Sequence, residues 1–142
     1  VYEIDSSGQI VDTRLLFANT KNGEGTSTTI TGVDQGHSLG FFIVQDGARA
    51  GITDGDTFEF VDASDGGAAQ VTDGANIDLL INGIDSDVIV FHSADASMNL
   101  DGLEHVRFGA QETREALIVG FEDLLNGGDR DFEDVVFELA WI

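Results

Sequence analysis

The sequence predicts an all-β domain, a β-sandwich of about eight to ten short antiparallel strands joined by long loops. Apolar residues alternate with polar ones or come in short runs, which is typical of strands. These runs end at Gly, Asp and Asn, the residues that favour turns. The chain also holds 18 glycines and twice as many Asp as Glu residues, which indicates many turns because Glu favours helices.

Four strands are expected in the first half of the chain. Residues 14–19 carry the apolar run Leu-Leu-Phe-Ala, and residues 26–31 are rich in β-branched threonine. Residues 39–45 read Leu-Gly-Phe-Phe-Ile-Val-Gln, which predicts a buried strand. Residues 57–61 alternate between apolar and polar side chains, which indicates a strand with one buried face.

Five more strands are expected in the second half, at residues 77–82, 88–92, 105–108, 117–121 and 135–141. Along the last of them, alternate apolar side chains share one face: Val135, Phe137, Leu139 and Trp141. Helices are expected to be limited to short pieces at residues 93–99 and 121–125. The loops between the strands are predicted to be long and to be stapled by calcium ions.

The length of 142 residues suits one domain with its own core, and we expect residues 1–142 to form a single domain cut from a larger protein. No signal peptide precedes the first alternating segment. No apolar stretch approaches the roughly 20 residues of a membrane span. The sequence therefore predicts no direct insertion into a membrane.

The charge balance excludes several partners. The chain has 27 acidic and six basic residues, a formal net charge of −21. Nucleic acids and anionic membrane surfaces bind clustered Lys and Arg, so neither is an expected partner. The absence of cysteine removes disulfides, thiol catalysis and Cys-ligated zinc.

The clearest candidate site is the acidic segment at residues 129–134. Asp129, Asp131 and Asp134 follow a double glycine and lead directly into an apolar strand. Calcium takes six to eight oxygen ligands, mostly from carboxylates and backbone carbonyls, on a flexible loop. Three neighbouring aspartates repel one another unless a cation neutralises them, so this segment predicts a calcium site. The alternative is a solvated acidic turn.

Two further pairs could add ligands. Glu122 and Asp123 lie just before the double glycine, although they could instead be acidic residues at a helix N-terminus. Asn99 and Asp101 repeat the two-residue spacing beside a glycine, although they could instead form an Asx-turn. The sequence thus predicts several calcium ions, in an extracellular setting where calcium is plentiful.

Catalytic motifs are missing from the sequence. There is no HExxH pattern and no Gly-x-Ser-x-Gly elbow. We expect His92 and His105 to hydrogen-bond backbone groups near loops instead of binding zinc. Nothing distinguishes any two carboxylates as a glycosidase pair, so the domain is predicted not to be an enzyme.

Three segments, taken together, carry a family resemblance. They are Leu39-Gly-Phe-Phe-Ile-Val, then Phe91-His-Ser with Asn99-Leu-Asp-Gly-Leu-Glu-His, then Gly120-Phe-Glu-Asp-Leu with Gly127-Gly-Asp-Arg-Asp-Phe-Glu-Asp-Val-Val-Phe. Over residues 37–142 the chain resembles a calcium-dependent domain of very large RTX adhesins from Gram-negative bacteria, first catalogued as a domain of unknown function. Where that family usually has Asn before the last Asp of the final motif, this chain has Glu133.

The resemblance implies a β-sandwich with several bound calcium ions, exposed on the cell surface as one monomeric unit of a long adhesin. It also implies that the domain binds the free C-terminus of a peptide or protein on a host or neighbouring cell. The residues expected to hold metal are Asp129, Asp131, Asp134, Asp123, Asp101, Asn99 and Glu122. Those expected at the ligand are Gly127, Gly128, Arg130 and Asp101.

Two other functions fit the same residues. A calcium-dependent lectin could use sugar hydroxyls to complete the calcium shell, which would make a glycan the partner. A structural extender domain would use calcium only to make the chain rigid. The sequence does not separate these alternatives from peptide binding.

Overall fold

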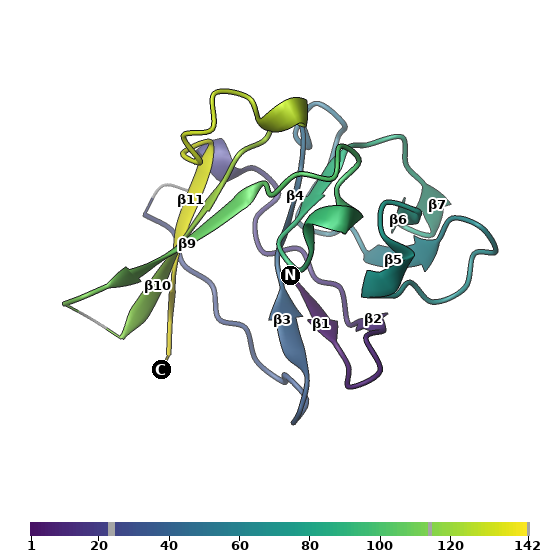
Figure 1. Cartoon of the computed structure of the whole chain (residues 1–142), viewed down its shortest axis with the longest axis horizontal. Coiled ribbons are helices and arrows are strands. Elements are labelled where there is room, and N and C mark those ends of the chain that lie inside the picture. The colour runs from purple at the N-terminus through teal and green to yellow at the C-terminus, as the bar shows by residue number, and fades with distance from the viewer. Residues whose placement is uncertain (23–24, 114, 142) are drawn as a thin grey trace.

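The computed structural model describes residues 1–22, 25–113 and 115–141, and these residues are almost entirely strands and loops (Figure 1). The strands are β1 (Tyr2–Ile4), β2 (Ile10–Val11), β3 (Ser38–Gly40), β4 (Phe42–Val44), β5 (Phe58–Asp62), β6 (Ile77–Ile81), β7 (Ile84–Asp85), β8 (Val90–His92), β9 (Val106–Gln111), β10 (Ala116–Phe121) and β11 (Val135–Ala140). Short 3-10 helices are η1 (Thr20–Asn22), η2 (Val71–Asp73), η3 (Ala96–Met98) and η4 (Leu125–Gly127). The predicted all-β class is confirmed.

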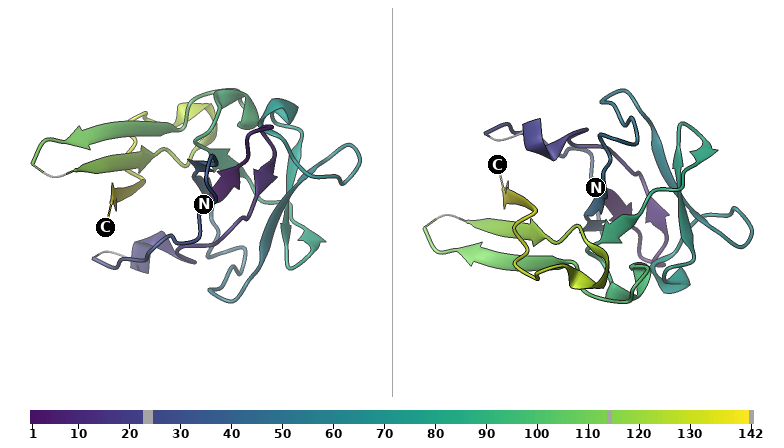
Figure 2. Two further views of the ribbon diagram at one scale, coloured as in Figure 1. Left: turned by 90° about the horizontal axis from the view of Figure 1, so that it is seen from below. Right: turned by 90° about the horizontal axis from the view of Figure 1, so that it is seen from above.

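The strands form small antiparallel sheets, with the orders β2-β1-β3, β11-β10-β9, β4-β8 and β5-β6-β7. Figure 1 shows the sheet β11-β10-β9 at one end of the molecule and β5-β6-β7 at the other, with β1 and β3 between them. The two views in Figure 2 keep this order. In the described residues, no helix has both the length and the apolar character to cross a membrane.

Two apolar clusters hold the sheets together, and one segment separates them. Phe41 belongs to the cluster of β10 and β11, where its ring lies 5.3 Å from that of Phe137. Its neighbour Phe42 packs on the other cluster, 5.1 Å from the ring of Phe60 in β5. Successive side chains of an extended segment point to opposite faces. Residues 38–44 therefore divide the core between two layers, as in a β-sandwich.

Two of the strand predictions are wrong. Residues 14–19 form no strand, because consecutive apolar side chains serve different cores: Leu15 packs on the cluster of β5, and Leu16 on that of β10. Residues 26–31 form no strand either. Most of this segment is exposed, and Ile30 alone among its residues is packed on a core cluster, so burial does not support its β-propensity.

The remaining expected strands are confirmed, with small changes. Residues 39–45 divide into β3 and β4 at Phe41, and the strands predicted after residue 56 correspond to β5, β6, β8, β9, β10 and β11. Strands β1, β2 and β7 were not expected. The helix predicted at residues 93–99 reduces to the single turn η3. The helix predicted at residues 121–125 is wrong, because Phe121 ends strand β10 and the turn η4 begins only at Leu125. Trp141 follows the end of β11 and is 69% exposed, so it does not share the buried face of Phe137.

Candidate metal centre

The loop between β10 and β11, residues 122–134, brings the acidic residues together. Several of its residues have a positive φ, in the left-handed region of backbone conformation: Asn126 (φ 63°), Gly127 (φ 78°), Gly128 (φ 43°), Arg130 (φ 61°) and Phe132 (φ 59°). Non-glycine residues rarely adopt this conformation. Such a concentration within a few residues folds the loop back toward the end of β10, so that its carboxylates converge.

Five carboxylates form two groups that share one member. In the first group, ligand oxygens of Glu122, Asp129 and Asp131 lie within 4.8 Å of one another. In the second, those of Glu122, Asp123 and Asp134 do so. Glu122 is buried, at 1% exposure, whereas the two aspartates of the first group and Asp134 face solvent. Two cation positions are thus possible, one in each group, and Glu122 could contribute to both.

The Glu122 carboxylate lies in a confined space. Its Oε2 accepts a hydrogen bond of 3.0 Å from the Arg130 N–H. A Cβ at Gly128 would lie 2.0 Å from Glu122 Oε1, so only glycine leaves room for this carboxylate. Burial, followed by the neighbouring Asp134 carboxylate, raises the pKa of Glu122. The anionic form is therefore disfavoured unless positive charge is supplied nearby.

Asp123 is positioned by contacts to its backbone. Its N–H donates to Asp134 Oδ2 at 2.9 Å, and its carbonyl accepts from Gln45 Nε2 at 2.6 Å. Burial and then the Asp134 carboxylate raise the pKa of Asp123 as well. Gln45 was not recognised from the sequence, because no local spacing connects it to a residue 78 positions later.

Ion pairs do not neutralise these carboxylates among the described residues. The ion pairs found there involve Arg14, Arg49, His37 and His105, and none includes a member of either group. The charge of Lys21 lowers the pKa of Asp123, but burial and Asp134 outweigh it, so the pKa remains raised. Arg130 lies in the same loop, but its side chain folds over Gly127, where a Cβ would lie 3.0 Å from its Nε. The negative charge of the two groups is therefore only partly compensated by the described side chains.

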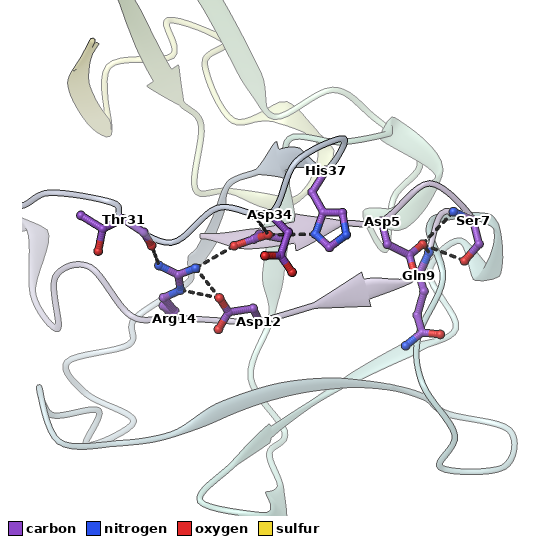
Figure 3. Close-up of polar contacts among 9 residues, drawn as sticks. Asp5, Ser7, Gln9, Asp12, Arg14, Thr31, Asp34 and His37 are labelled. Carbon is purple, nitrogen blue, oxygen red and sulfur yellow. Dashed lines mark hydrogen bonds and ion pairs between the residues drawn. The ribbon is translucent and has the colours of Figure 1, made fainter. Parts of the chain in front are cut away.

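Glu3, the other glutamate that is buried among the described residues, provides a comparison. Glu3 Oε1 accepts from Arg14 Nη2 at 2.7 Å, and Glu3 Oε2 accepts from the Asp34 N–H at 3.1 Å. His37 Nδ1 lies 2.9 Å from the same Oε2 (Figure 3). Glu3, Asp34 and His37 also cluster within 4.8 Å, yet Arg14 compensates the charge of this glutamate. Glu122 has no equivalent partner.

Asp101 and His105 brace the loop from a neighbouring segment. Asp101 Oδ2 accepts from the Asn126 N–H at 2.6 Å, and Asp101 Oδ1 accepts from the Leu103 N–H at 3.0 Å. The buried His105 ring lies between two acceptors, with Nε2 2.9 Å from Asp101 Oδ2 and Nδ1 2.9 Å from the Glu122 carbonyl oxygen. The expected contact between His105 and a backbone group is confirmed.

The pKa of Asp101 reports the same contacts. Burial by itself would raise the pKa of this carboxyl, but the Leu103 N–H, the His105 ring and the Asn126 N–H together lower it below its ordinary value. The anion of Asp101 is thus satisfied by protein donors. This differs from Glu122, whose pKa is raised.

The side-chain amide of Asn99 is also engaged in hydrogen bonds with the backbone. Its Oδ1 accepts from the His92 N–H at 2.7 Å, and its Nδ2 donates to the Leu103 carbonyl at 2.8 Å. Asp101 lies outside the two carboxylate groups. The side chains of Asn99 and Asp101 thus make hydrogen bonds that hold the loops, and metal binding by these two residues stays a prediction. The structure brings together the remaining expected ligands, which are Glu122, Asp123, Asp129, Asp131 and Asp134.

Gly120 lets the loop lie against β10, a role that was not recognised from the sequence. A Cβ at this position would be 2.3 Å from the Phe132 carbonyl oxygen. The Arg107 guanidinium lies 4.7 Å from the centre of the Phe132 ring. An isolated glycine within a strand often marks the close approach of another backbone, and this signal could have revealed the contact.

Replacing Gly120 with alanine is expected to reduce the free energy of unfolding by about 1–3 kcal/mol, because the added methyl would force the loop backbone away. Gly109→Ala is a matched control, since its Cβ would meet only the Ile118 Cβ at 4.0 Å. Urea denaturation of both variants in calcium measures the effect. Equal stabilities would mean that the contact of residue 132 with β10 contributes nothing.

The donors available in the two groups are all oxygens, which suit hard cations such as calcium. There is no thiolate, and the nearby His105 is already committed to other partners. Asp129 and Asp131 are exposed, which leaves access for water or a ligand oxygen on their side of the group. The residues therefore fit calcium, with a position open to an external ligand.

Comparison with known proteins gives a single result. A family model described as "Domain of unknown function (DUF4114)" matches residues 33–141, which include the whole carboxylate loop. No curated protein matches the chain. No solved structure matches it either.

Proposed function

Because the chain belongs to the DUF4114 family, whose function is unknown, we propose its role from its own chemistry: a calcium-dependent, non-enzymatic binding module of a bacterial surface adhesin. The ligand would be the free C-terminal carboxylate of a peptide or protein on another cell. The resemblance to domains of RTX adhesins supports the adhesin role and an extracellular location.

The metal proposal rests on a difference between the surroundings of two buried glutamates. Glu3 has a guanidinium 2.7 Å away, whereas Glu122 has a backbone N–H and further carboxylates around it. A buried charge is stable only when it is paired or coordinates a metal. A divalent cation in each group would offset most of the formal charge of the five carboxylates.

The ligand proposal rests on the exposed group. Asp129 and Asp131 face solvent, so an ion held by them and Glu122 would keep coordination positions for outside oxygens. In a chain with a net charge of −21, such an ion is the positive centre that an anionic peptide end requires. Arg130, exposed in the same loop, could donate a charge-assisted hydrogen bond to it.

Calorimetric titration tests this proposal. Peptide mixtures with free C-termini are expected to bind in millimolar calcium, whereas amidated mixtures and samples with chelator should give no heat. Equal binding of both mixtures would contradict recognition of the carboxylate. No peptide binding at all would redirect the search to glycans if a glycan array reacts with the domain, and to a structural extender if it does not.

Asp131→Ala is expected to weaken calcium binding at least about tenfold, since one of the three carboxylates of the exposed group is lost, and to abolish peptide binding. The fold should remain, because this side chain is exposed. Asp85→Ala removes the same charge from the exposed strand β7, outside both groups, and should behave as the parent. Calcium titration of the three proteins by calorimetry measures the difference, and unchanged affinity in Asp131→Ala would remove it from the site.

A further inference from the structure

Strand β9 has a free edge. It is the last strand in the order β11-β10-β9, and the Glu122 N–H donates to the His105 carbonyl just before β9 begins. In an antiparallel pair, hydrogen-bonded and non-hydrogen-bonded residues alternate. The backbone N–H and C=O groups of Val106 and Phe108 therefore point away from β10. Within residues 1–22, 25–113 and 115–141, no other strand pairs with them.

A hollow of about 560 Å³ lies along this edge. Its walls are residues 92–96 on one side and Glu104 with residues 106–108 on the other. A volume of this size is within the range of ordinary ligand sites, and the Phe108 side chain is 53% exposed beside it. A peptide strand could occupy the hollow and pair with the edge.

His92 contributes to the inner wall of the hollow. It is only 4% exposed, and its ring packs on the core, 5.8 Å from the ring of Tyr2 and 4.9 Å from that of Phe60. Because core packing fixes this side chain, the wall of the hollow on this side is preformed, as is usual for ligand sites.

Arg107 contacts both the hollow and the carboxylate loop. It lines the hollow and also lies 4.7 Å over the ring of Phe132, which belongs to that loop. Val106 pairs with Phe121, next to Glu122, while Phe108 pairs with Val119, further from the loop. A peptide whose last residue is at the loop would therefore run from Phe108 toward Val106, opposite to the direction of β9.

We propose that the peptide recognised by this domain adds to the edge of β9 as an antiparallel strand, with its C-terminal carboxylate at the calcium of the exposed group. This inference rests on the proposed function and specifies how the rest of the ligand binds. Recognition of this kind uses the peptide main chain for affinity and pockets for alternate side chains. A second copy of the domain is a poor occupant, because each copy carries a net charge of −21.

Amide hydrogen exchange, followed by NMR in calcium, tests the added strand. The probe is a mixture of random hexapeptides with free C-termini at saturating concentration. The amides of Val106 and Phe108 are expected to exchange at least about tenfold more slowly when the mixture is bound, because their N–H groups gain partners. The amides of Arg107 and Gly109 already face β10, so they serve as internal controls and should not change.

Two N-methylated mixtures then test the register of pairing. One carries methyl groups on alternate peptide nitrogens at odd positions from the C-terminus, and the other at even positions. Only one mixture should lose the protection of Val106 and Phe108, because alternate residues of a paired strand donate to the partner. Equal effects of the two methylations would overturn the added strand.

The remaining outcomes separate this inference from the proposed function. Calcium-dependent binding of the hexapeptides with no change at Val106 and Phe108 would overturn the added strand and leave the carboxylate site intact. Absence of any calcium-dependent binding heat would overturn both.

Discussion

Removal of calcium is expected to lower the melting temperature of this domain by about 10 °C or more. A ligand at a hundredfold excess over its dissociation constant stabilises the native state by about 2.7 kcal/mol per site. Two carboxylate groups would give about twice that value. For a chain near this size, each kcal/mol shifts the melting temperature by about 2–4 °C. Scanning calorimetry in calcium and in excess chelator measures the shift.

Excess calcium added back after the chelator is the control for this experiment, and it should restore the original melting temperature. The loop at 122–134 should be the first to exchange amide hydrogens faster in chelator, because the carboxylates there repel one another. A shift of about one degree would contradict a structural role for the ion.

The substitution Glu122→Gln is expected to have opposite effects with and without calcium. In chelator, the amide removes a buried charge that lacks a cation, so the variant should be more stable than the parent by about 1–3 kcal/mol at pH 7. In calcium, the variant loses the carboxylate shared by both groups and should be less stable by about as much or more. Urea denaturation under both conditions measures the change of sign.

The pH dependence follows from the same side chain. The pKa of Glu122 is raised in the folded state, so this carboxyl binds a proton more tightly when folded than when unfolded. It therefore destabilises the metal-free protein above its folded pKa, and this penalty disappears as the pH falls toward the ordinary Glu value of about 4.3. The advantage of Glu122→Gln in chelator should shrink accordingly between pH 7 and pH 4.

Glu3→Gln is the matched control, because Glu3 is the other glutamate that is buried in the described part of the chain and already has Arg14 as its partner. This variant should be destabilised to the same extent in calcium and in chelator, since it leaves Arg14 without its buried counter-charge. A calcium-dependent effect at Glu3, or the same sign in both conditions at Glu122, would contradict the assignment of the metal to Glu122.

The strands that the sequence predicted well are those whose pattern agrees with their pairing. The alternation at residues 57–61 and 135–141 matches β5 and β11, because each strand buries one face on a single core. The prediction of a strand at residues 14–19 was wrong for the opposite reason, since Leu15 and Leu16 pack on two different core clusters. An apolar pattern shows which side chains can share one face of a strand, but it does not show whether they pack on one core or on two.

The candidate site was predictable only in part. Asp129, Asp131 and Asp134 were recognised from their spacing, and the structure places them around Glu122 and Asp123. Spacing could not show that Glu122 belongs to both groups. The contact of Asp101 with Asn126 spans 25 residues, and it depends on the packing of separate loops, which local patterns do not report. The same holds for the hydrogen bonds that occupy Asn99.

The first two strands have a consequence for anyone who moves this domain into another protein. The family match begins at residue 33, yet β1 forms the middle of the sheet β2-β1-β3. The fully buried Tyr2 lies against Gly40, where even a Cβ would be 2.2 Å from its ring. A gene segment encoding only residues 33–141 would leave β3 unpaired and an empty space of aromatic size in the core. The portable unit must therefore begin no later than Tyr2.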